Sequence, residues 1–135
     1  MDDRNLNVLK LRPEIPRAKV GERTTRNESF QNKTLRPIAK LQNDILTEIF
    51  KNYIIKRKNV YHKLSDQKKQ DYIEHAVKTD SKLRVLIQGI FIGLFTKQEY
   101  LEYLENHRAL NKRITNLSFE RIRSQMQLFE RINDN

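Results

Sequence analysis

The three histidines are the side chains of this chain best suited to metal binding or to acid–base chemistry. They are His62, His75 and His107, and no two of them are three or four residues apart. A helix therefore cannot present two of them to one metal ion. His75 follows Asp71 by four residues, which permits an Asp–His contact on one helix face but is equally typical of a surface histidine. We predict no catalytic or metal-binding role for these side chains.

Three glutamates, Glu99, Glu102 and Glu105, recur at every third residue. Carboxylates at this spacing can share one side of a helix and hold a divalent cation. The same pattern is typical of a solvated helix face, which we expect here because Lys97 and Arg108 are close in the sequence. The chain also has no cysteine and no glycine-rich phosphate loop, nucleophile elbow or HExxH motif. The sequence therefore predicts no bound cofactor and favours a non-catalytic function.

The net charge of +10 predicts an acidic partner, whether nucleic acid, an anionic membrane surface or an acidic protein. The densest basic cluster is Lys56, Arg57 and Lys58, at the end of the first predicted helix. These three residues are our candidates for contact with an anion or a nucleic acid. The alternative is a solvated helix end, where cations also suit the helix dipole. No zinc-finger, KH or RNP motif accompanies the cluster.

Apolar residues recur at helical spacing over most of the chain beyond its first quarter. The predicted helices cover residues 35–58, 66–78, 82–94, 97–106 and 109–132. Thr34, Ser65 and Thr96 are the expected N-caps of the first, second and fourth helices, and Glu99 completes a capping box with Thr96. We therefore predict an all-α fold, a small bundle of about four to five helices formed by residues 29–135.

The most apolar stretch of the chain is residues 85–95. Its length corresponds to about 16 Å of helix, whereas the apolar core of a membrane is about 30 Å thick. We expect no membrane span but a buried helix, with a buried β-strand as the alternative because β-branched and aromatic residues are frequent here. Gly89 and Gly93 are four residues apart, a spacing that permits close contact between helices, and we expect a neighbouring helix to pack closely on them.

Residues 1–28 have the composition of an extended or disordered N-terminal arm, flexible relative to the helical domain. They contain two prolines, one glycine and a long polar run. Leu9, Leu11 and Ile15 alternate with charged residues. This pattern is either incidental to a flexible tail or marks an extended segment that docks into a groove of this protein or of a partner. We name these three residues as candidate partner contacts.

The predicted helix over residues 109–132 has an apolar surface wider than one neighbouring helix requires. Phe119 and Met126 lie beside its main apolar face, and we name them as further candidate partner contacts. Either the helix is central in the fold, or a partner or a second copy of the chain covers part of it. Arg121 falls on the main apolar face, where an arginine either extends its guanidinium to water or meets a carboxylate.

Four segments of the chain resemble a group of short bacterial proteins that often carry the name glyoxalase. They are residues 30–38, 40–43, 92–96 and 109–113, and the similarity covers most of the chain beyond the arm. The name implies a metal-dependent lyase that acts on the glutathione adduct of methylglyoxal. Glyoxalase I proteins bind the metal with His, Glu and Gln side chains on strands of paired βαβββ modules. This sequence offers neither a strand-rich module nor a matching ligand set.

The function that the sequence favours is a non-catalytic protein-binding or regulatory module, with a protein partner or as a homo-oligomer. The alternatives are a glyoxalase-type lyase, implied by the resemblance, and an RNA- or ribosome-associated protein, indicated by the charge. The cytoplasm is the expected location, because the chain lacks cysteine and its first residues lack the apolar core of a signal peptide.

Overall fold

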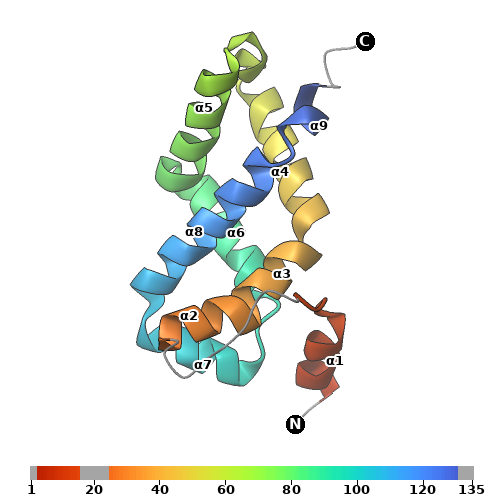
Figure 1. Ribbon diagram of the computed structural model, residues 1–135, viewed down its shortest axis with the longest axis vertical. Helices are drawn as coiled ribbons and strands as arrows, with labels where there is room; N and C mark the ends of the chain where they lie inside the picture. The colour runs from red at the N-terminus through yellow and green to blue at the C-terminus, as the bar shows by residue number, and fades with distance from the viewer. Residues whose placement is uncertain (1–2, 16–24, 131–135) are drawn as a thin grey trace.

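The computed structural model describes residues 3–15 and 25–130, and every regular element within these ranges is helical (Figure 1). The elements are α1 (Asp3–Leu11), α2 (Arg26–Phe30), a π-helical turn (Gln31–Leu35), α3 (Arg36–Leu41), α4 (Asn43–Lys56), a 3-10 turn (Val60–Lys63), α5 (Asp66–Thr79), α6 (Ser81–Ile92), α7 (Lys97–Glu105), α8 (His107–Arg123) and α9 (Met126–Glu130). The all-α prediction is confirmed, and the β-strand alternative for residues 85–95 is wrong. Residues 16–24 of the predicted arm and the end of the last predicted helix lie outside the described ranges.

The first predicted helix begins earlier in the chain than expected. It starts at Arg26, where the Thr25 side chain accepts a hydrogen bond from the N–H of Glu28 (3.1 Å). Thr34 is therefore not an N-cap. It lies within the π-helical turn, and its hydroxyl donates to Glu99 (2.8 Å). The helical domain thus begins within the segment that the sequence assigned to the arm.

Breaks within the predicted helices explain why the predicted number of helices was less exact than the fold class. The π-helical turn ends at Leu35, two residues before Pro37, whose missing N–H removes one hydrogen bond from the helical ladder. Gln42, with φ −91° and ψ 10°, separates α3 from α4. A turn after Arg123 separates α8 from α9. Each break divides a segment that apolar periodicity alone describes as continuous.

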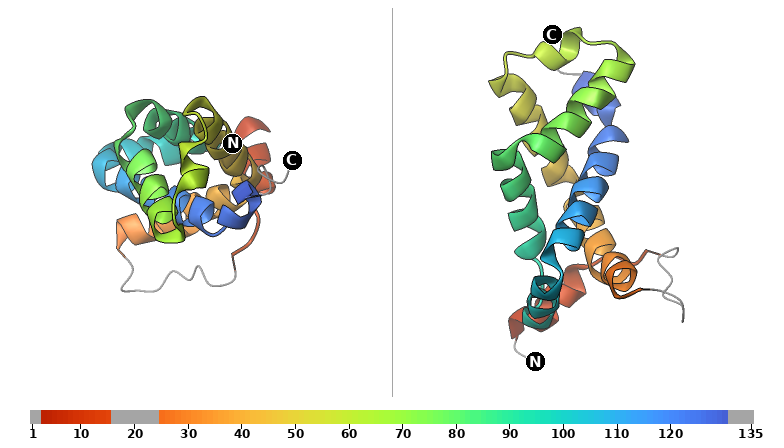
Figure 2. Two further views of the ribbon diagram at one scale, coloured as in Figure 1. Left: turned by 90° about the horizontal axis from the view of Figure 1, so that it is seen from above. Right: turned by 90° about the vertical axis from the view of Figure 1, so that its left-hand side faces the viewer.

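Helix α8 lies at the centre of the bundle and contacts α3, α4, α5 and α6 (Figures 1 and 2). Leu110, Ile114, Leu117 and Ile122 of this helix are buried. Burial of each large aliphatic side chain stabilises the fold by about 1.5–3 kcal/mol. The wide apolar surface predicted for this helix is therefore covered within the chain, because several neighbours share it.

Aromatic side chains close the end of the bundle at which α4 is joined to α5. Phe50 stacks on Tyr53 with ring centroids 5.4 Å apart and meets Tyr61 and Tyr72 edge-on. Phe129 of α9 is fully buried, with its ring centroid 5.6 Å from that of Phe50. Such pairs add stabilisation beyond the burial of their area. The cluster therefore attaches the C-terminal helix to α4.

Residues 3–11 of the predicted arm form helix α1, so the expectation of an extended or disordered arm is wrong for this part. Arg4 donates hydrogen bonds to the carbonyl oxygens of Phe95 (2.8 Å) and Gly93 (3.0 Å). The side-chain oxygen of Asn5 accepts from the first N–H of α7 (3.0 Å). These contacts satisfy backbone groups that the end of α6 and the start of α7 leave without helical partners. Order in the arm thus depends on a corner about 90 residues away in the sequence.

Arg12, near the end of the described arm, forms a bidentate salt bridge with Glu99 of α7. Nη1 donates to Oε2 (2.6 Å) and Nη2 to Oε1 (2.5 Å), and the two side chains are only 8% and 15% exposed. Glu99 also accepts from the Thr34 hydroxyl and from the N–H of Thr96, both at 2.8 Å. The Thr96–Glu99 capping box is therefore confirmed. A solvated Glu99 was the wrong expectation, because the capping box turns this carboxylate back toward the helix start, where Arg12 covers it.

Candidate functional site

Helix α6 has apolar side chains on more than one side, and only one of these sides is buried. Leu83, Ile87 and Phe91 are spaced four residues apart and face the core. Val85 and Leu86 are 64% and 50% exposed. The prediction of a buried helix is therefore right for one side of α6 only. Within the described ranges no helix is both long enough and apolar enough to cross a membrane.

Gly89 and Gly93 are exposed, so the expectation that a neighbouring helix of this chain packs on them is wrong. A Cβ added at Gly89 would meet nothing within 4 Å. At Gly93 an added Cβ would meet the carbonyl oxygen of Gly89, in the same helix, at 3.1 Å. Gly89 lies about 200° around the helix axis from Ile87, so it faces away from the core into which Ile87 points. This side of α6 is therefore open.

A groove of about 360 Å³ lies between α4 and α6. Its apolar lining consists of Ile49 and Tyr53 from α4 and Leu83 and Leu86 from α6. Ile45, one turn before Ile49, is 50% exposed and extends the apolar side of α4. The polar lining residues gather toward the end of α4 and the start of α6: Asn52, Lys56, Arg57, Asp80 and Lys82. We call this site the apolar groove.

The predicted basic cluster at the end of α4 is divided among three surroundings. The guanidinium of Arg57 pairs with Asp80 (2.7 Å) and lies 3.5 Å from the centre of the Tyr53 ring. Lys56 is exposed and lines the apolar groove, whereas Lys58 is exposed in a left-handed turn with φ 60°. The structure therefore brings Lys56 and Arg57 to the groove but gives Arg57 an internal partner. Nucleic-acid contact by this cluster stays a prediction.

Asp80 links the two helices that form the apolar groove. Its Oδ1 accepts from the N–H of Leu83 (3.1 Å), and its Oδ2 accepts from Arg57 and from the Tyr53 hydroxyl (3.1 Å). The bond from Leu83 chiefly, with those from Tyr53 and Arg57, holds the pKa of Asp80 below its usual value. Burial first, and then the bond to Asp80, raises the pKa of Tyr53 to about 12. At neutral pH the tyrosine is therefore the donor and the carboxylate the acceptor.

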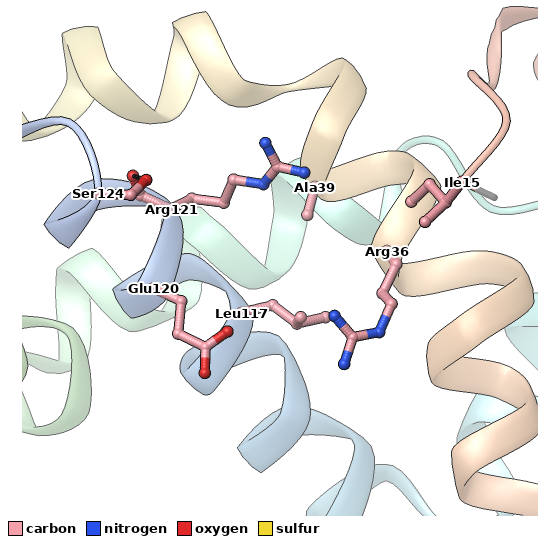
Figure 3. A pocket seen from close by; sticks show the side chains of 7 residues that line it. All are labelled: Ile15, Arg36, Ala39, Leu117, Glu120, Arg121 and Ser124. Carbon is pink, nitrogen blue, oxygen red and sulfur yellow. Dashed lines mark hydrogen bonds between the residues drawn. The ribbon is translucent and has the colours of Figure 1, made fainter. Parts of the chain in front are cut away.

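The predicted contact residues of the arm lie outside the apolar groove. Leu9 and Leu11 are exposed on α1, where Val8 is the buried residue. Ile15 lines a separate pocket of about 230 Å³ (Figure 3). The other residues lining that pocket are Arg36, Ala39, Leu117, Glu120, Arg121 and Ser124. Because a residue of the arm forms part of its wall, we assign this pocket to docking of the arm rather than to a ligand.

The candidate residues of the two C-terminal helices pack largely within the chain. Arg121 is half-buried and forms no salt bridge with a described residue. In Figure 3 its side chain extends toward Ala39, and the Glu120 carboxylate points elsewhere, which fits a guanidinium that reaches out from an apolar side. Phe119 and Met126 are partly buried against the core. Their role as partner contacts stays a prediction.

The histidines occupy separate elements of the fold. His62 lies in the 3-10 turn, His75 on α5 and His107 on α8. No group of three or more His, Cys, Asp or Glu side chains in residues 3–15 and 25–130 could hold a metal ion. The described residues therefore do not assemble the donor set that the glyoxalase resemblance implies.

Sequence reasoning missed the apolar groove, although α6 carried a signal for it. Val85, Leu86 and Ile87 are consecutive, so their side chains must point to different sides of a helix. Only the third of them is buried, and exposed apolar surface of this kind typically marks a binding site. No family model, curated protein or solved structure matches the chain, so the use of the groove has to be inferred from its own side chains.

Proposed function

We propose that this protein is a non-catalytic protein-binding module whose apolar groove receives an amphipathic helix of a partner protein. The observation that carries the proposal is the exposure of large aliphatic side chains around one groove. Leu86, which lines the groove, is 50% exposed, and so is Ile45, one turn before the lining residue Ile49. Water contact at these side chains is unfavourable by about 25 cal/mol per Å² of apolar surface, which a bound apolar face would recover.

A helical occupant fits the groove better than an extended one. The walls are the two helices α4 and α6, whose backbone groups are hydrogen-bonded within each helix, so no strand edge is offered to an extended peptide. An amphipathic helix instead presents apolar side chains at every third or fourth residue to such a groove. The open surface at Gly89 also permits a partner helix to approach α6 closely.

The charge of the groove favours an acidic partner. Lys56 and Lys82 line its polar end, and the carboxylate of Asp80 is already engaged by Arg57 and Tyr53. Carboxylates on the partner helix would complement the two lysines and orient the helix in the groove. A second copy of this chain is less suitable, because two molecules of net charge +10 repel each other.

The test is affinity capture from the cells that make this protein, with quantitative mass spectrometry of the bound proteins. The baits are the wild type, Leu86→Glu in the groove, and Leu104→Glu as a matched control. Leu104 is 47% exposed on α7 and lies outside the groove lining. We expect an acidic partner on the wild type and the control, reduced about 30-fold on Leu86→Glu. Equal recovery on the two variants would rule out this groove as the binding site.

The lyase activity implied by the glyoxalase resemblance stays an alternative prediction without an assembled donor set among the described residues. A cytoplasmic location, expected from the lack of cysteine, is part of the same proposal, because it would place the protein among reduced, soluble partners. Association with RNA, the third expectation from the sequence, stays an alternative prediction, and two residues of the cluster it rests on, Lys56 and Arg57, line the polar end of the apolar groove.

A further inference from the structure

A second groove is lined by residues of α5, α6 and α8. Helix α6 packs beside α8, below the end of α5 in Figure 2 (right). The groove has a volume of about 560 Å³, and four of the residues that line it are basic: Lys78, Arg84, Arg108 and Lys112. None of the residues that line it is acidic. We call it the cationic groove, and we propose that it binds the phosphodiester backbone of a nucleic acid duplex.

The positive charge of the cationic groove is largely uncompensated. Arg84, Arg108 and Lys112 are exposed, and none of them forms a salt bridge within the part of the chain that the structure describes. Lys78 pairs with Glu74 (3.0 Å), but both side chains are nearly half exposed, so water and salt screen the pair. Three cations from two helices therefore remain available to one anionic ligand.

The geometry of Arg84 prepares it for a second contact. Its Nη1 donates to the carbonyl oxygen of Lys78 (3.1 Å), in the last turn of α5. A guanidinium carries five N–H donors in a planar fork, so this bond leaves several donors free. Arginine held in this way is well suited to phosphate oxygens, which it binds in bidentate fashion.

Neutral hydrogen-bonding side chains fill the space between the cations. Gln88, Asn111 and Thr115 line the cationic groove. The Asn111 carbonyl oxygen accepts from the Tyr103 hydroxyl (2.6 Å), which fixes the amide and leaves its NH₂ group as a donor. Amide and hydroxyl side chains beside Lys and Arg are the usual donors to the phosphates and sugars of nucleic acids.

The composition of the lining selects among anionic partners. It contains no aromatic residue, so it offers no platform on which the bases of a single strand could stack. It also contains no Leu, Ile, Val or Phe, whereas protein–protein interfaces have an apolar centre. A duplex presents its phosphates outward and needs neither feature, so a duplex backbone is the anion that the cationic groove fits.

The test is fluorescence anisotropy of a labelled RNA duplex and a labelled DNA duplex at graded salt concentrations. The groove variant is Arg84→Gln/Arg108→Gln/Lys112→Gln. The control, Lys33→Gln/Lys63→Gln/Lys68→Gln, removes the same charge from exposed lysines outside both grooves. Circular dichroism and the melting temperature establish that both variants are folded.

We expect the groove variant to flatten the slope of log affinity against log salt by about two to three, at about 0.9 per phosphate on a duplex. The control should keep the wild-type slope, and the tighter of the two duplexes identifies the natural source of the backbone. An equal decrease of the salt slope in the two variants, or a decrease in the control alone, would overturn the proposal. Equally tight binding of single-stranded RNA, or displacement of the duplex by poly-glutamate at equal charge, would also overturn it.

Discussion

The two grooves that flank α6 share positive charge but differ in the side chains between the charges. The apolar groove has lysines at one end and aliphatic and aromatic side chains along its length. The cationic groove has arginines and lysines throughout, separated by amide and hydroxyl groups. Charge alone therefore predicts an acidic partner for both, and the neutral residues between the charges determine its kind. An apolar lining favours a protein helix, whereas a polar lining favours a phosphate backbone.

One helix produces this difference because its side chains point in three directions. Leu83 and Ile87 enter the core, Leu86 borders the apolar groove, and Arg84 and Gln88 border the cationic groove. Steps of about 100° per residue separate these sides within two turns. The position of α6 therefore determines the shape of both grooves at once, and the α6–α7 corner that holds its end becomes important to both.

The largest expected effect comes from removing the carboxylate at that corner. Glu99→Ala should lower the free energy of unfolding by about 3 kcal/mol, because it leaves the charge of the buried Arg12 without a partner and removes the capping box. Urea unfolding measures the change. Glu105→Ala is the control, since Glu105 makes only an exposed pair with Arg26 (3.6 Å), and the control should change stability by less than about 0.5 kcal/mol. An equal loss of stability in the two variants would contradict a stabilising role of the Glu99 salt bridge and capping box.

Loss of the contacts at the α6–α7 corner should also lower the affinity of both grooves for their ligands. Under conditions in which Glu99→Ala is still folded, capture of the protein partner and duplex binding should both decline, because α6 loses its fixed end. A decline in one activity alone would show that the grooves are positioned independently of each other.

The second effect separates the grooves. Leu86→Glu should reduce partner affinity by about 2 kcal/mol and leave duplex binding unchanged, because burying a charge in an apolar interface is unfavourable. The triple Gln variant of the cationic groove should reduce duplex affinity and leave partner binding unchanged. Titration of both ligands against both variants measures the four combinations. A variant that lowers the affinity for both ligands equally would indicate that the two ligands share one site.

The third effect concerns the open side of α6. Gly89→Ala should raise the free energy of unfolding by about 1 kcal/mol, because alanine favours the helix and its Cβ would meet nothing within 4 Å. Gly93→Ala should raise the free energy of unfolding by less, since its Cβ would lie 3.1 Å from the Gly89 carbonyl oxygen. Thermal unfolding gives both values. If a partner helix packs closely on this side, Gly89→Ala should also weaken capture of the partner while stabilising the free protein.

The smallest expected effect is a pH dependence at the same corner. Burial alone would raise the pKa of Glu99, but the bonds from Arg12, Thr96 and Thr34 outweigh it and hold the pKa below its usual value. A carboxyl whose pKa is lower in the folded state stabilises the fold above its unfolded pKa and loses this contribution as pH falls through its folded pKa. Stability of the wild type should therefore fall below about pH 4.5, and Glu99→Gln should fall less steeply. If the stability of the wild type and of Glu99→Gln falls equally with pH, groups other than Glu99 cause the loss of stability in acid.

Local features of the fold could be predicted from the sequence, because they depend on neighbouring residues. Ser65 caps α5, as expected, and Thr96 with Glu99 caps α7. The apolar periodicity also placed α5 and α6 within two residues of their true bounds. In each case the hydrogen bonds or the apolar face lie within one turn or one helix, so a short stretch of sequence contains all the information that is needed.

Features that join distant segments could not be predicted in this way. Helix α1 depends on Arg4 and Arg12, which bind carbonyl oxygens at the end of α6. Arg108 and Lys112 lie on α8, in a region of the sequence whose charges nearly balance, so their concentration beside Arg84 is visible only once α6 and α8 are packed together. The basic cluster at Lys56 was more conspicuous in the sequence, yet folding divides it.

Site-specific photocrosslinking at two positions of α6 tests most directly whether the two grooves bind different ligands. A photoreactive amino acid replaces Leu86 in one variant and Gln88 in the other, and adducts formed in living cells are treated with nuclease or with protease. We expect position 86 to give protein adducts that resist nuclease, and position 88 to give adducts that nuclease removes. The same set of adducts from both positions, or no protein adduct at position 86, would contradict the assignment of a protein helix to one groove and a nucleic acid backbone to the other.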